Sequence, residues 1–146
     1  MLTDGDAVDF DFIFRDLKWL IQNYGIDEFY FDPYFQAEWL TQKLEAETGA
    51  VRVEFPQTVV NFSPAMKTAE RMIHARQIRH NGHPILNWQF GNVKAKSNVN
   101  GDIRPEKQKH GDHRTIDGIV AMIMAIRKWL TLEAGSFYED NDLEVF

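Results

Sequence analysis

The 146-residue chain contains no cysteine, so disulfide bonds are excluded and a bound metal would need histidine or carboxylate ligands. It lacks an uncharged apolar run long enough to span a membrane, and its opening MLTDGDAVDF has neither the basic nor the apolar region of a signal peptide. No GxxxxGK[S/T] phosphate loop and no nucleophile elbow is present. We therefore expect a cytoplasmic protein with no membrane association and no nucleotide-driven motor of its own.

Hydrophobic residues make up 44% of the chain, with 11 Phe and 4 Trp, which favours one compact domain over residues 1–146. The net charge of −6 is unevenly distributed. Residues 67–114 contain 10 basic and 4 acidic side chains, whereas residues 1–66 contain 4 basic and 12 acidic ones. Residues 133–146 are expected to form an acidic C-terminal tail. The basic middle segment suits a phosphate backbone, and it equally suits an ordinary charged surface.

Local patterns divide the chain into helices and strands. Apolar residues recur at helical spacing in some segments and alternate in others, and capping residues mark several ends. The expected elements are a helix from Asp9 to Tyr24, a strand over 26–31, a helix over 35–48, a strand over 51–55, a helix opened by Ser63-Pro64 and running to about Gln77, extended segments over 85–88 and 93–99, and a buried helix from Ile116, capped by Thr115, to about Leu132. Asn100-Gly101 is a strong hairpin signal. This order predicts an α/β fold with parallel strands covered by helices.

Two aspartates lie where an α/β fold places polar sites. Asp32 directly follows the strand expected over residues 26–31, and Asp117 lies in the first turn of the last helix, where the helix dipole stabilises a carboxylate. Two carboxylates meeting at one sheet end would suit Mg²⁺ or Mn²⁺, because these cations prefer oxygen ligands. Taken alone, each aspartate is more often structural, as a turn former or a helix-dipole partner.

Histidines and basic residues form further groups. The pairs His80/His83 and His110/His113 would allow a four-histidine zinc site, although such residues in turns are more often surface groups. Basic residues gather around the expected hairpin and in the loop before Asp117, namely Lys94, Lys96, Arg104, Lys107, Lys109 and Arg114. Alternate lysines on a hairpin suit a DNA clamp, and they are also a common protection of an exposed strand edge.

Several motifs occur together in a fixed order. They are Tyr30-Phe31-Asp32-Pro33-Tyr34, Arg79-His80-Asn81-Gly82-His83-Pro84-Ile85-Leu86-Asn87-Trp88, Asn92, Pro105-x-Lys107 and Ile116-Asp117-Gly118-Ile119-Val120-Ala121, with Gly5-Asp6-x-Val8-Asp9 at the beginning and Ser136-Phe137-Tyr138-Glu139 with Leu143 at the end. In this series, over nearly the whole chain, the sequence resembles the nuclease domain of the large terminase subunit of tailed phages. A single Asp-Pro or Ile-Asp-Gly would be weak evidence, whereas the ordered series is fairly specific.

The resemblance implies an RNase H-like (integrase-like) fold with a two-metal site, binding Mg²⁺ or Mn²⁺, that cleaves DNA during genome packaging in a bacterial host. Of the three acidic residues that the family uses, Asp32 matches the one at the end of a later strand and Asp117 the one at the start of a C-terminal helix. His80, Asn92 and Lys107 match recurrent family positions, and we expect them to support the site or contact DNA together with Lys94, Lys96, Lys109 and Arg114. The implied partners are double-stranded DNA, the terminase ATPase domain, the small subunit and the portal.

The chain departs from the family pattern at its beginning. The family's first acidic ligand lies on an early strand that precedes the Gly5-Asp6 segment, so we expect this ligand and the opening strands to be missing. A site with two of three carboxylates would bind metal more weakly. The alternative function is therefore a non-catalytic prophage remnant or fragment that keeps the fold and binds DNA or a packaging partner. Loss of the early strands would expose a sheet edge, which makes a homodimer a further expectation.

Overall fold

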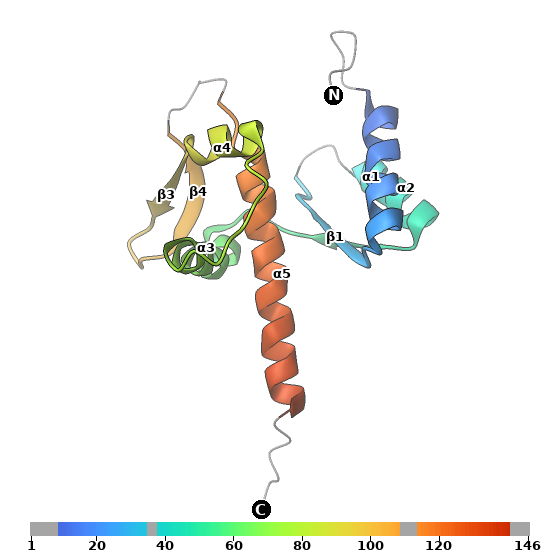
Figure 1. The fold of residues 1–146 in the computed structure, drawn as a ribbon. Helices are drawn as coiled ribbons and strands as arrows, with labels where there is room; N and C mark the ends of the chain where they lie inside the picture. The colour runs from blue at the N-terminus through green and yellow to red at the C-terminus, as the bar shows by residue number, and fades with distance from the viewer. Residues whose placement is uncertain (1–8, 35–37, 109–113, 141–146) are drawn as a thin grey trace, which may run out of the picture. The chain divides into compact units, whose positions relative to one another are not determined.

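The structure is a computed structural model that describes residues 9–34, 38–108 and 114–140, the last eight of these by their backbone alone. The chain divides into two compact units, Met1–Pro56 and Gln57–Phe146, and each is described by itself (Figure 1). That the two units act together as one domain stays a prediction. Across the described residues, no helix is long and apolar enough to cross a membrane.

The first unit opens with helix α1, Phe10–Tyr24, whose two ends are fixed by local capping. The Asp9 carboxylate accepts a hydrogen bond from the Phe12 N–H at 3.0 Å, which satisfies an amide that has no partner inside the helix. Gly25 ends the helix in the left-handed conformation at φ 61°, where a side chain would be strained. Both predicted ends of this helix are confirmed.

Two parallel strands follow, joined by a helical crossover. Strand β1, Glu28–Phe31, pairs in parallel with β2, Val51–Glu54, and helix α2, Glu38–Thr48, connects them (Figure 1). The core of this unit consists of Phe14, Ile21, Leu40, Leu44 and Ala50. The predicted parallel pairing is confirmed. On α2, Leu40 and Leu44 are buried, whereas Trp39 is 53% exposed.

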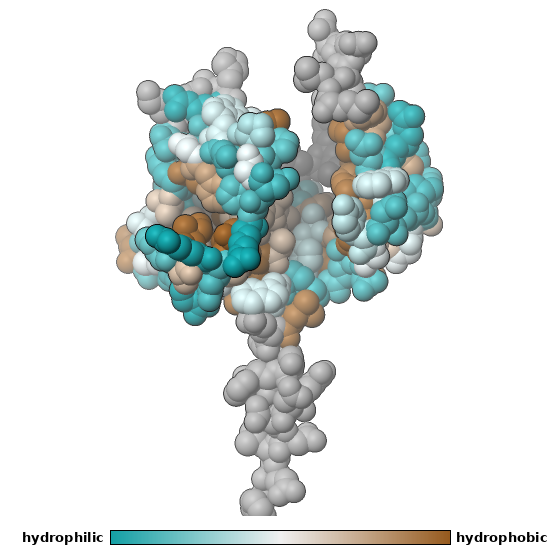
Figure 2. All heavy atoms as spheres, viewed as in Figure 1, coloured by the Kyte–Doolittle hydropathy of each residue, from teal (hydrophilic) through white to brown (hydrophobic). Residues whose placement is uncertain are grey.

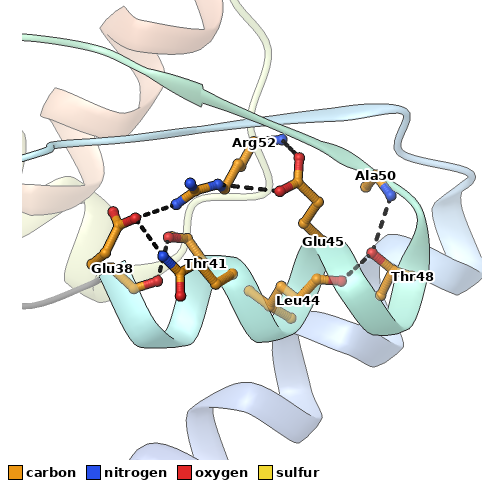
Figure 3. A network of polar contacts seen from close by, with 8 residues as sticks. Glu38, Thr41, Leu44, Glu45, Thr48, Ala50 and Arg52 are labelled. Atoms are coloured by element: carbon orange, nitrogen blue, oxygen red, sulfur yellow. Dashed lines mark hydrogen bonds and ion pairs between the residues drawn. The ribbon is translucent and has the colours of Figure 1, made fainter.

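Arg52 joins β2 to α2 through two carboxylates (Figure 3). Its guanidinium lies 2.6 Å from Glu38 Oε1 and 3.1 Å from Glu45 Oε2, and its backbone N–H donates to Glu45 Oε1 at 3.2 Å. The hydrogen bond from Arg52 lowers the pKa of Glu38, and the same bond raises the pKa of Arg52. These contacts fix β2 against the helix, and β2 in turn holds β1, whose end carries Asp32.

The second unit begins with helix α3, Val59–His74, which starts earlier than predicted. Thr58 is the N-cap, and its hydroxyl accepts from the Asn61 N–H at 3.3 Å. The prediction that Ser63-Pro64 opens this helix is wrong, because Pro64 lies inside it. The buried Ser63 hydroxyl accepts instead from the Ile103 N–H at 3.3 Å, so it is used to hold a segment 40 residues away.

Residues 85–88, expected to be extended, form part of helix α4, Pro84–Phe90, so that prediction is wrong. Pro84 occupies the first turn, where its fixed φ suits a helix and its missing N–H costs nothing. The residues of this helix that are buried or half-buried are Leu86, Gln89 and Phe90. The second and third lie three and four residues after the first, which places all three on one helix face. Tertiary contacts of this short segment therefore select a helix over a strand.

A β-hairpin follows α4, as predicted. Strand β3, Val93–Ser97, pairs antiparallel with β4, Ile103–Lys107. The Asn98 side-chain oxygen accepts from the N–H groups of Asn100 and Asp102, both at 2.9 Å, and Gly101 supplies the positive φ of 76° that the turn requires.

Helix α5, Asp117–Asp140, ends the described chain. It begins one residue after the predicted start and continues beyond the predicted end at about Leu132. Ile116, Ile119 and Ile123 are buried, as are Phe62 and Ala65 of α3, and α5 contacts both α3 and α4. The apolar composition of this helix suggests burial on every side. The structure shows burial along one face only, because Ala121 and Ala125 are exposed.

Candidate metal and nucleic-acid site

Asp32 lies at the carboxyl end of β1, directly after Phe31, as the sequence predicts. It is half-buried, and its Oδ1 accepts a hydrogen bond from the Tyr34 N–H at 3.0 Å. This local turn fixes the direction of the carboxylate and leaves its second oxygen for other contacts. The position is the one where α/β sheets present polar groups to a ligand.

Asp117 is the first residue of α5 and is exposed to solvent. Among the described residues, nothing forms a side-chain hydrogen bond or ion pair with it. Its carboxylate therefore lies at the positive end of the helix dipole with both oxygens available to a ligand.

The backbone around Asp117 is held by two buried amide side chains. Gln89 Nε2 donates to the Thr115 hydroxyl at 3.0 Å, and Gln89 Oε1 accepts from the Gly118 N–H at 2.9 Å. Asn92 Nδ2 donates to the Thr115 carbonyl at 3.3 Å, and the Asn92 carbonyl accepts from the Gln108 N–H at 3.0 Å. Asn92 thus holds the backbone just before Asp117, and its role in supporting a metal or DNA site stays a prediction. Gln89 was missed in the sequence, because no local pattern marks a partner 26 to 29 residues away.

The hairpin of the same unit carries a charged face. The register pairs Lys94 with Glu106 and Lys96 with Arg104, so three cations and one carboxylate share one face. Glu106 lies 3.2 Å from Lys94 Nζ and 2.8 Å from Lys96 Nζ. Hydrogen bonds from Lys96 and then Lys94 lower the pKa of Glu106 to about 2. The two lysines are therefore held together by a shared counter-charge, which sequence spacing alone did not indicate.

The remaining predicted site residues lie in different surroundings. His80 is exposed, its Nδ1 accepts from the Gly82 N–H at 3.1 Å, and its ring centroid lies 6.3 Å from that of Phe90. Lys107 ends β4 next to Gln108, whose N–H donates to the Asn92 carbonyl, and Arg114 immediately precedes Thr115, whose carbonyl accepts from Asn92 Nδ2. Lys109 lies outside the described residues, as do His110 and His113 of the conceivable zinc site.

The structure places the two predicted carboxylate ligands in different units, Asp32 in the first and Asp117 in the second. Counting only side chains in the described ranges, no group of three histidine, aspartate or glutamate residues gathers that could hold a metal ion. The meeting of Asp32 with Asp117 at one cation stays a prediction.

The second unit also contains a cavity of about 210 Å³ between α3, the hairpin and α5. Its lining is mainly apolar and includes Met66, Ile73, Phe90, Val93, Ile103 and Ile119. Figure 2 shows apolar atoms in a hollow of this unit, flanked by hydrophilic ones. Glu70, His74 and Lys94 also line this cavity, whereas Asp117 does not, so the cavity is distinct from the region around Asp117.

Comparisons with known proteins identify the fold class and then the family. The crystal structure of the HK97 bacteriophage large terminase superimposes with a TM-score of 0.72 at 26% sequence identity, over 86% of this chain and 26% of that one. The fold is therefore α/β of the RNase H-like class, as predicted. The family described as terminase large subunit, endonuclease domain, matches residues 2–133. The chain belongs to this family.

Two relatives agree with this assignment. Protein YmfN of Escherichia coli (strain K12) is 31% identical over 140 residues, which cover 96% of this chain and 30% of that protein. The large terminase subunit of Enterobacteria phage HK97 is 27% identical over 129 residues, which cover 85% of this chain and 24% of that protein. The chain thus spans less than a third of the length of these relatives.

Proposed function

We propose that this chain is a nuclease module that cleaves double-stranded DNA during phage genome packaging in the bacterial cytoplasm, with Asp32 and Asp117 as ligands of Mg²⁺ or Mn²⁺. The observation that carries the proposal is the Asp117 carboxylate, which begins α5 without a protein partner in the described chain, on a backbone fixed by two buried amides. Membership of the terminase endonuclease family supports it.

The two aspartates fit a hard divalent cation. Carboxylate oxygens are the ligands that Mg²⁺ and Mn²⁺ prefer, and one oxygen of Asp32 and both oxygens of Asp117 are available. If bound there, such ions would supply an activated water and would stabilise the leaving oxygen of a phosphodiester. The chain's own contribution is to orient the ligands, through the Asp32–Tyr34 turn in the first unit and through Gln89 and Asn92 in the second.

The hairpin of the second unit would bind the DNA backbone. Within the paired strands, Lys94, Lys96 and Arg104 share a face with the Glu106 carboxylate, Lys107 ends β4, and Arg114 lies three residues before α5. Cations arranged in this way bind phosphates without reading sequence. We extend the same role to Lys109 and His80 as predictions.

A second candidate function is a non-catalytic protein that keeps the fold and binds DNA or a packaging partner. It is favoured by one observation: within each unit's described residues, no three potential ligands gather. By family membership, the partners would be the terminase ATPase domain, the small subunit and the portal. A homodimer would use the sheet edge of β1 or β2, since in the described chain each of these strands pairs with one neighbour only.

Plasmid cleavage in Mn²⁺ tests the proposal. The parent chain is compared with Asp32→Ala and Asp117→Asn, and with Asp16→Ala as a control for loss of an exposed acid elsewhere on the surface. We expect cleavage by the parent and the control, none by the two site variants, and none in EDTA. Cleavage that survives in Asp117→Asn would reject the proposed ligand role. DNA binding without any cleavage would favour the second function.

A further inference from the structure

The start of α5 lacks a capping side chain of its own, so the prediction that Thr115 caps this helix is wrong: the Thr115 hydroxyl accepts from Gln89 Nε2 instead. The residue before the helix is Ile116, whose buried side chain cannot accept a hydrogen bond, while its carbonyl accepts the N–H groups of both Ile119 and Val120 at 3.0 Å. The Gly118 N–H is one of the amides that no carbonyl inside the helix can satisfy. Gln89 of α4 accepts it, at 2.9 Å, and so caps α5 from another helix.

The contacts of Gln89 lie on both sides of Asp117. Its Nε2 donates to the hydroxyl of Thr115, two residues before Asp117, and its Oε1 accepts from the N–H of Gly118, the residue after Asp117. Gln89 is only 7% exposed, so water replaces neither contact easily. The amide therefore fixes the short backbone segment that carries the Asp117 carboxylate.

Gly118 permits this close approach. A Cβ atom at this position would lie 2.5 Å from Gln89 Oε1 and 3.4 Å from Leu86 Cδ1. Contacts of 2.5 Å do not occur between such atoms, so an alanine would push the glutamine amide away. Because that amide is the far end of a flexible side chain, it can move without breaking the fold.

We infer that Gln89 is a positioning residue: it fixes the first turn of α5 and thereby the direction in which Asp117 presents its carboxylate to a divalent cation. The cation part of this inference rests on the proposed function, whereas the effect of Gln89 on the helix start does not. Groups that orient a metal ligand typically change metal affinity by about ten- to a hundredfold when removed.

The test uses the full chain and the variants Gln89→Ala, Gly118→Ala and the double variant. Amide hydrogen exchange at residues 117–119 is measured by NMR without metal, and Mn²⁺ affinity is measured by EPR, with Asp117→Ala as the reference for binding lost. Thr58→Ala is the matched control, because it removes a helix cap from α3 in the same unit without touching α5. We expect each single variant to exchange faster at residues 117–119 and to bind Mn²⁺ about tenfold more weakly. The double variant should be no worse than Gln89→Ala, because Gln89→Ala already removes the amide that Gly118→Ala would displace.

The outcomes separate this inference from the proposed function. Faster exchange at residues 117–119 in Gln89→Ala, but not in Thr58→Ala, supports the positioning role of Gln89. If the parent binds Mn²⁺ no better than Asp117→Ala, the metal site is rejected, but the effect of Gln89 on the helix start is not. Unchanged exchange in Gln89→Ala overturns the inference. It is also overturned if Thr58→Ala weakens Mn²⁺ binding equally, or if the losses in the two single variants add in the double variant.

Discussion

Replacing Lys94 and Lys96 together by alanine should reduce the salt dependence of DNA binding. The two ammonium groups lie on one face of the hairpin, both within 3.2 Å of Glu106, and their side chains remain 47% and 51% exposed. They are thus close enough to each other to be held by one carboxylate and open enough to reach phosphates. Each phosphate contact contributes about 0.9 to the slope of the logarithm of the binding constant against the logarithm of salt concentration.

Two contacts therefore correspond to a change in slope of about 1.8. Between about 50 and 200 mM salt, a fourfold range, the parent should lose about twelvefold more affinity than the double variant, since four raised to the power 1.8 is about 12. Glu106→Gln should act in the opposite direction and raise affinity at low salt, because it removes the carboxylate that pairs with Lys94 and Lys96 while leaving both lysines and Arg104.

Fluorescence anisotropy of a labelled DNA duplex, titrated at several KCl concentrations, measures these slopes. The matched control is Lys18→Ala/Lys43→Ala, which removes two cations from the first unit, where they pair with Glu47 and Asp11. A slope that is the same in the hairpin double variant and the parent would refute the proposed interface. So would an equal change in the control, which would indicate that only total charge matters.

Two further predictions concern stability. The pKa of Glu106 is lowered to about 2 from an ordinary 4.5, so its pairing with Lys94 and Lys96 stabilises the fold fully above pH 4.5, and this contribution is lost as pH falls toward 2. Between pH 4.5 and 2, the free energy of unfolding in urea should therefore fall more for the parent than for Glu106→Gln. Parallel pH profiles of the two proteins would contradict the assignment. Leu44→Ala should lower the free energy of unfolding by about 2–5 kcal/mol, because Leu44 is only 2% exposed. Val60→Ala, at a position that is 68% exposed, should change it little. Both are measured by circular dichroism during urea denaturation, and equal losses would argue against the core described for the first unit.

Local chemistry was enough to predict much of this protein. Helix α1 begins and ends where Asp9 and Gly25 place it, because capping and the left-handed conformation depend on residues only a few positions apart. The turn at Asn100-Gly101 follows from the same kind of local preference. The series of motifs around Asp32, His80 and Asp117 indicated the terminase family, which the comparisons confirm.

Other features follow from contacts between segments far apart in the chain, and only the tertiary structure decides them. Ser63 and Pro64 have the local pattern of a helix start, yet Ser63 binds the hairpin and the helix begins at Thr58. Residues 85–88 read locally as extended, whereas burial of one side of the segment makes it helix α4. Gln89 has no distinguishing local pattern, because its partners come from α5. Capping and turn preference therefore determined α1 and the hairpin turn, while contacts between distant segments determined the start of α3, the helical form of α4 and what holds Asp117 in place.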